Sequence, residues 1–107
     1  MKISTTFRHK TQDVALKRYV QRAATSLEMY TNNIHRVDIV FAIESKNIES
    51  HQTSCHIALH LLGKENIDIR AVCKRSKDAF DQAFNLVRCE LSHANKYRLK
   101  GSYQRAV

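Results

Sequence analysis

Lysines and arginines are the residues of this sequence whose types and spacing point most directly to chemistry. They occur in groups near the first quarter, the last third and the end of the chain. The candidate set is Lys17, Arg18, Arg22, Lys74, Arg75, Lys77, Lys96, Arg98 and Lys100. Guanidinium and ammonium groups spaced along one surface match the repeating phosphates of a nucleic acid. No acid follows Glu90, so the end of the chain carries unbalanced positive charge.

The overall charge points the same way. The 107 residues include 18 Lys and Arg against 10 Asp and Glu, which gives a net charge of +8 and an isoelectric point near 9.7. Such an excess favours RNA, DNA or an anionic membrane surface as the partner. Tyr97 and Tyr103 lie between the last cations and could stack on an unpaired base. We expect a nucleic acid rather than a membrane, because the apolar helix faces are needed to cover a sheet.

Catalytic and metal-binding patterns are weak. The sequence has no nucleophile elbow, P-loop or GxGxxG motif, so we expect no enzyme activity, no cofactor and no small-molecule substrate. His56 and His60 fall on the exposed face of a predicted strand, whereas Cys55 and Cys73 fall on the other face, so the strand period separates possible metal ligands. An odd number of cysteines without a CxxC motif does not indicate a disulfide framework and fits a reducing cytoplasm.

Hydrophobic periodicity predicts the elements that must position these cations. Alternating apolar residues predict strands, and apolar residues three or four apart predict helices. The predicted strands cover 2–8, 36–44, 54–62 and 67–74, and the predicted helices cover 12–30 and 76–100. Thr11 and Ser76 are the expected N-caps, and Gly101 is the expected stop of the second helix. Ile43 is expected to point inward with the other apolar residues of its strand.

The expected fold class is α+β, a β-α-β-β-β-α sandwich in one domain over 1–107, with 101–107 as a short C-terminal tail. A right-handed crossover should make the first two strands parallel, and the last three strands should form an antiparallel meander. Each strand has a single apolar face, so both helices should cover one face of a four-stranded sheet. No apolar run is long enough to span a bilayer, and the first residues lack the apolar segment of a secretory signal.

The order of elements and several short motifs resemble the family of ribosome hibernation-promoting factors and ribosome-associated inhibitors, also labelled sigma-54 modulation proteins. The motif residues that match in the first helix are Ala15, Leu16, Tyr19, Val20, Leu27, Glu28 and Tyr30. In the second helix the matches are Asp78 and Phe80 at its start and Lys96, Arg98 and Lys100 at its end. The sequence departs from the family pattern at Arg8-His9-Lys10, Gln82-Ala83-Phe84 and Ser92.

The resemblance implies a cytoplasmic translation inhibitor without catalytic activity. Members of this family bind the small ribosomal subunit and the 70S ribosome, in the channel for messenger RNA and transfer RNA, under stress or in stationary phase. A chain that stops soon after the second helix resembles the short type, which lacks a further dimerising domain. The nine cations named above, together with Arg88, would then contact the phosphates of 16S rRNA, with Lys96, Arg98 and Lys100 as a clamp.

Two alternatives remain open at this point. A double-stranded RNA-binding module has the order α-β-β-β-α, although this chain lacks its Gly-Pro-x-His loop and the lysine-rich start of its second helix. A basic interaction protein that docks on an acidic protein partner would need only the charge.

Overall fold

The computed structural model describes the backbone of residues 1–8, 12–30, 33–44, 52–63 and 65–99, and their side chains as far as Ser92. The elements are β1 (Lys2–Arg8), α1 (Val14–Thr25), the 3₁₀ turn η1 (Ser26–Met29), β2 (Ile34–Ile43), β3 (Thr53–Leu61), β4 (Ile67–Cys73) and α2 (Ser76–Leu99). Every predicted strand and helix is present in the predicted order. The expected stop at Gly101 and the expected tail, 101–107, lie outside the described residues.

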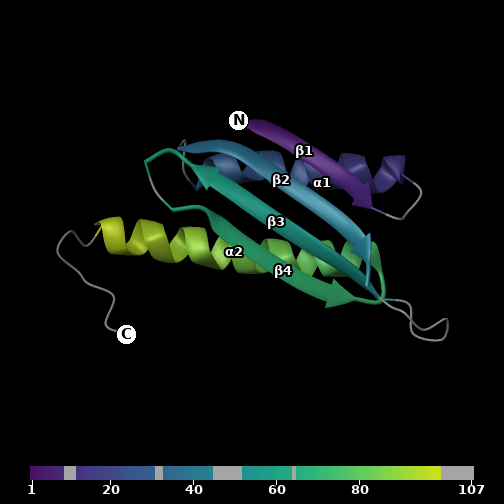
Figure 1. Cartoon of the computed structure of the whole chain (residues 1–107). Coiled ribbons are helices and arrows are strands. Elements are labelled where there is room, and N and C mark those ends of the chain that lie inside the picture. The colour runs from purple at the N-terminus through teal and green to yellow at the C-terminus, as the bar shows by residue number, and fades with distance from the viewer. Residues whose placement is uncertain (9–11, 31–32, 45–51, 64, 100–107) are drawn as a thin grey trace.

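The four strands form one sheet in the order β1-β2-β3-β4 (Figure 1). β1 pairs with β2 in parallel, from Lys2 opposite Arg36 to Arg8 opposite Ala42. The β2–β3 and β3–β4 pairs are antiparallel, so the last three strands form the expected meander. Because β1 and β2 are parallel, the chain crosses over between them, and α1 lies in that crossover.

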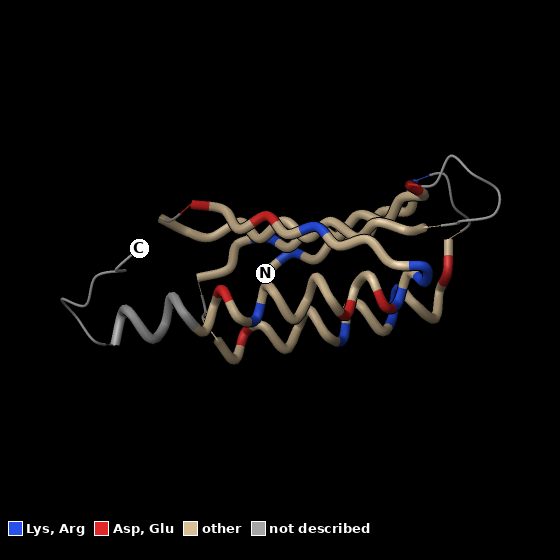
Figure 2. Tube along the Cα trace, turned by 90° about the horizontal axis from the view of Figure 1, so that it is seen from below, with Lys and Arg blue, Asp and Glu red and all other residues tan. Residues whose placement is uncertain are grey.

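Both helices cover the same face of the sheet, and the opposite face is open (Figure 2). The apolar sides of the helices and the inward residues of the strands form a single core. Its largest fully buried side chains include Phe41 from the sheet, Phe80 from α2 and Leu27 from η1. The structure therefore confirms the α+β sandwich with both helices on one face.

The start of α1 differs slightly from the sequence prediction, whereas α2 begins at the predicted residue. Asp13 is the N-cap of α1: its carboxylate accepts a hydrogen bond from the backbone N–H of Leu16 at 3.0 Å. The expected cap, Thr11, was therefore wrong, because a carboxylate two residues later satisfies a free N–H of the first turn. At α2 the carbonyl of Arg75 accepts the first helical bond, from the backbone N–H of Ala79 at 3.0 Å, so Ser76 is already helical.

Two further details of β2 were not predicted. The strand begins at Ile34, two residues before the predicted start. The sequence did not indicate this start, because an irregularity between Ile34 and Arg36 interrupts the alternation of apolar residues. Ile43 lies on the predicted face, opposite the buried Thr53, but is 40% exposed. It is the last residue of β2, so within this strand it has a neighbour only on its N-terminal side.

Within the described part of the chain, no helix is both long and apolar enough to cross a membrane.

Candidate nucleic-acid interface

The predicted cations that the structure describes lie on the helix layer and in the turn that leads into it. Lys74 and Arg75 are exposed in the turn between β4 and α2, and Lys77 is exposed in the first turn of α2. Figure 2 shows lysines and arginines along both helices. Lys96 and Arg98 belong to the last turns of α2, but their side chains lie outside the description, as does Lys100 entirely.

The two helices run side by side in the same direction (Figures 1 and 2). Side chains from both of them line a groove. Early in both helices, the Tyr19 hydroxyl donates to Oδ1 of Asp81 at 2.5 Å. These two residues, together with others from both helices and from η1, line one groove of about 430 Å³. Its lining consists of Tyr19, Ala23, Ser26, Asp81, Phe84, Asn85 and Arg88. In this groove, the polar side of α2 therefore faces the side of α1 that carries Tyr19.

Lys77 lies beside Asp81 and Tyr19 at one end of this groove. Its ammonium nitrogen lies 3.9 Å from Oδ2 of Asp81 and 5.1 Å from the centre of the Tyr19 ring. The pKa of Tyr19 is raised, first by its hydrogen bond to Asp81 and then by burial and by the charge of Asp81, against an opposing effect of Arg88. The contacts with Asp81 thus favour the protonated phenol, and the Lys77 ammonium lies beside its aromatic ring.

Arg88 is positioned in a similar way at the other end of the groove. Its guanidinium carbon lies 5.3 Å from the centre of the Phe84 ring, and the group donates a hydrogen bond to Oδ1 of Asn85. A guanidinium group is planar and carries five N–H donors, so these contacts fix its plane and leave other donors for a ligand. Such a group suits bidentate binding of a phosphate.

The cations of α1 divide between two sides of that helix. Arg18 and Arg22 are one turn apart and line a shallow depression with Gln21 and Thr25. Lys17 is half-buried and lies two residues from Tyr19, which is about 200° around the helix. Since Tyr19 contacts α2, Lys17 faces away from the groove. The structure thus brings Lys77 and Arg88 to one groove and places Lys17 apart from them.

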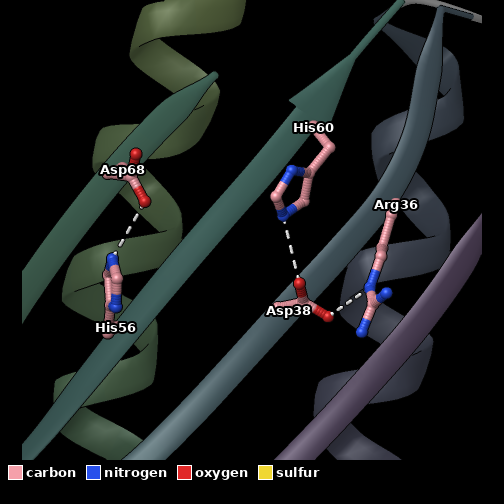
Figure 3. Close-up of polar contacts among 5 residues, drawn as sticks. All are labelled: Arg36, Asp38, His56, His60 and Asp68. Carbon is pink, nitrogen blue, oxygen red and sulfur yellow. Dashed lines mark hydrogen bonds and ion pairs between the residues drawn. The ribbon is translucent and has the colours of Figure 1, made fainter.

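The open face of the sheet carries a different arrangement, in which charges are paired (Figure 3). Asp38 on β2 accepts from the Arg36 guanidinium at 2.7 Å and lies 3.1 Å from Nε2 of His60. Burial alone raises the pKa of Asp38, but hydrogen bonds and charges of Arg36 and His60 outweigh it and hold that pKa below its usual value. The acid on this strand is therefore neutralised by its neighbours.

A second histidine–aspartate pair lies on the same face. His56 Nε2 is 3.1 Å from Oδ1 of Asp68 on β4, and Arg70 pairs with Glu44. His56 and His60 are thus on the face that was predicted for them, whereas Cys55 is buried on the other face, where burial raises its pKa to about 12. Among the residues that the structure describes, no three ligand-type side chains converge on a metal position.

Sequence reasoning missed the polar residues that complete these sites. Asp81 and Asn85 carry no motif, and Asp81 meets Tyr19 across 62 positions of the chain. The only signal available was helical spacing, because Lys77, Asp81, Asn85 and Arg88 are three or four residues apart and share one side of α2.

Comparisons with known proteins bear on the fold. No protein-family model and no curated protein matches the sequence. A ribosomal subunit interface protein from Coxiella burnetii is 17% identical, and the match covers 90% of this chain and 99% of that one with a TM-score of 0.73. The N-terminal domain of Protein Y from Thermus thermophilus is also 17% identical, with coverage of 87% and 98% and a TM-score of 0.73. The chain therefore has the fold of these two proteins, and the resemblance found in the sequence is confirmed at the level of the fold.

Proposed function

We propose that this protein binds the ribosome and represses translation without catalysing a reaction. The observation that carries the proposal is the shared fold, which spans 99% of a ribosomal subunit interface protein. The second support is the set of cations on the helix layer, on a chain of net charge +8. A ribosome-binding role would place the protein in the cytoplasm.

The finer proposal is a hibernation factor that occupies the channel for messenger RNA and transfer RNA on the small subunit, under stress or in stationary phase. In this role the cations contact phosphates of 16S rRNA. Lys96, Arg98 and Lys100 form a clamp at the end of α2, and the other predicted cations extend it. Each phosphate contact releases condensed counterions, so binding should weaken as salt increases.

Co-sedimentation with 30S and 70S particles on sucrose gradients, at low and moderate salt, tests this proposal. We expect the protein to travel with both particles at moderate salt. The triple variant that combines Lys96→Ala, Arg98→Ala and Lys100→Ala should bind less tightly. Its salt slope should fall by roughly 0.7–0.9 for each lost contact.

A matched control removes three cations from the open face of the sheet, with Lys2→Ala, Arg36→Ala and Arg70→Ala. This variant loses the same formal charge, so it should keep ribosome binding if the helix layer is the interface. Protein that stays at the top of the gradient even at low salt would reject the ribosome as the partner. Salt-sensitive binding to an acidic protein, without affinity for RNA, would favour the interaction-protein alternative.

A double-stranded RNA-binding module is less well supported than a ribosome-binding protein. Its α-β-β-β-α order has no counterpart of β1, which here pairs with β2 from Lys2 to Arg8.

A further inference from the structure

The groove between α1 and α2 has a feature that phosphate binding does not explain. Asp81 lies in the middle of it, between the cations Lys77 and Arg88. A carboxylate repels a phosphate, so the centre of the groove is unsuited to the RNA backbone. We propose that this groove binds the Watson–Crick edge of an unpaired guanine, a proposal that rests on the proposed function of binding RNA.

The lining of the groove fits a base better than it fits a charged group. Its volume of about 430 Å³ is in the range of sites for small organic molecules. Phe84, Ala23 and the ring of Tyr19 give it an apolar part. The guanidinium of Arg88, fixed over Phe84, offers a planar surface on which a base stacks.

The polar groups of the groove select among the bases. Asp81 and Asn85 are one turn apart on α2, about 5–6 Å between their Cβ atoms. Asp81 offers acceptors, since each carboxylate oxygen has a further lone pair beside its contact with Tyr19 or Lys77. Oδ1 of Asn85 already accepts from Arg88, so its amide nitrogen is the group that it presents to a ligand.

Guanine matches this pair of side chains. On its Watson–Crick edge, N1–H and the 2-amino group are neighbouring donors that suit a carboxylate, and O6 is an acceptor that suits an amide N–H. Adenine and uracil each lack two adjacent donors on this edge. Lys77 and Arg88, on either side of Asp81, are then placed to contact the phosphates that flank the bound nucleotide.

Fluorescence anisotropy with labelled single-stranded RNA tests this inference on the full chain. The probes are uridine-rich oligomers with one central guanosine, inosine or adenosine. Guanosine should bind about tenfold more tightly than adenosine, which is the size of discrimination that a bidentate contact provides. Inosine lacks only the 2-amino group, so its affinity should be intermediate.

The Asp81→Asn variant identifies the group responsible. Its amide oxygen can still accept from Tyr19, so the fold should be retained, but the preference for guanosine over inosine should disappear. The control is Asp78→Asn, which makes the same charge change at an exposed position outside the groove lining and should keep the preference.

Three results would overturn the inference. These are equal affinity for all three oligomers, no binding to any of them, or a uniform gain of affinity in Asp81→Asn, which would make the carboxylate a repulsive charge only. None of them decides the proposed function, because ribosome co-sedimentation is a separate measurement. Loss of co-sedimentation together with intact guanosine preference would instead reject the ribosome and leave the groove as an RNA site.

Discussion

The two faces of this molecule carry similar residues but differ in whether their charged side chains are paired. On the open face of the sheet, Asp38 is paired with Arg36 and His60, and Glu44 is paired with Arg70. On the helix layer, several cations have no carboxylate partner among the described residues. These are Arg18, Arg22, Lys74, Arg75 and Arg88. The cations of the open face are thus held by carboxylates, whereas these five cations of the helix layer are left without one.

The difference follows from the partners that the fold gives to the carboxylates. Facing residues on adjacent strands are about 5 Å apart, and diagonal ones remain within reach of long side chains, so acids and cations meet. On the helices, two carboxylates bind neutral donors: Asp13 caps the N–H of Leu16, and Asp81 accepts from the Tyr19 hydroxyl while its other oxygen lies 3.9 Å from the Lys77 ammonium. Of these two acids, only Asp81 also has a cation as a partner.

The largest expected effect on stability comes from removing a side chain that packs the helix layer against the sheet. Phe80 is 1% exposed and packs between Phe41 of the sheet, Tyr19 of α1 and Phe84 of α2. Phe80→Ala should lower the free energy of unfolding by about 3–5 kcal/mol, since it leaves a cavity in the core. Urea denaturation measures this change. RNA binding should weaken too, because Phe80 supports the packing of both walls of the groove.

Leu86→Ala is the control on the same helix. Leu86 is 45% exposed, so its loss should change stability by no more than about 0.5 kcal/mol. A similar loss in both variants would mean that Phe80 does not join the layers as its contacts indicate.

A medium effect should distinguish an unpaired cation from a paired one. Arg88→Gln removes a helix-layer cation, and Arg70→Gln removes one that pairs with Glu44. We expect Arg88→Gln to reduce RNA affinity and to lower the salt slope by roughly 0.7–0.9. Arg70→Gln should leave both unchanged. Salt titrations of oligonucleotide binding measure the slopes, and equal slopes for the two variants would refute the assignment of the field to the helix layer.

Much of the fold was predictable because its signals are local. Alternation and helical spacing predicted all four strands and both long helices, and the single apolar face of each strand placed the helices on one side. The cations of the helix layer were also predictable, since exposed residues follow from the same periods. One error concerns a single residue: the N-cap of α1 is Asp13 rather than Thr11.

The groove was not predictable, because long-range contacts create it. No local pattern indicates that Tyr19 meets Asp81, or that Asp38 meets His60 across two strands. The irregularity between Ile34 and Arg36 also hid the start of β2, since it breaks the period on which the prediction depends. The clamp of Lys96, Arg98 and Lys100 stays a prediction.

The smallest expected effect concerns the paired face and depends on pH. The pKa of Asp38 is lowered in the folded state, so its carboxylate contributes stability above the unfolded pKa of about 3.9, and this contribution is lost as pH falls through the folded value. At pH 7, Asp38→Asn should reduce the free energy of unfolding by about 1 kcal/mol. Below pH 4 the difference from the original protein should shrink toward zero, and urea denaturation at pH 7, 5 and 3 follows it. A difference that is the same at all three values would show that the charge of Asp38 does not stabilise this face. RNA binding at pH 7 should not change, because the pairs of the open face lie on the side of the sheet away from the helix layer.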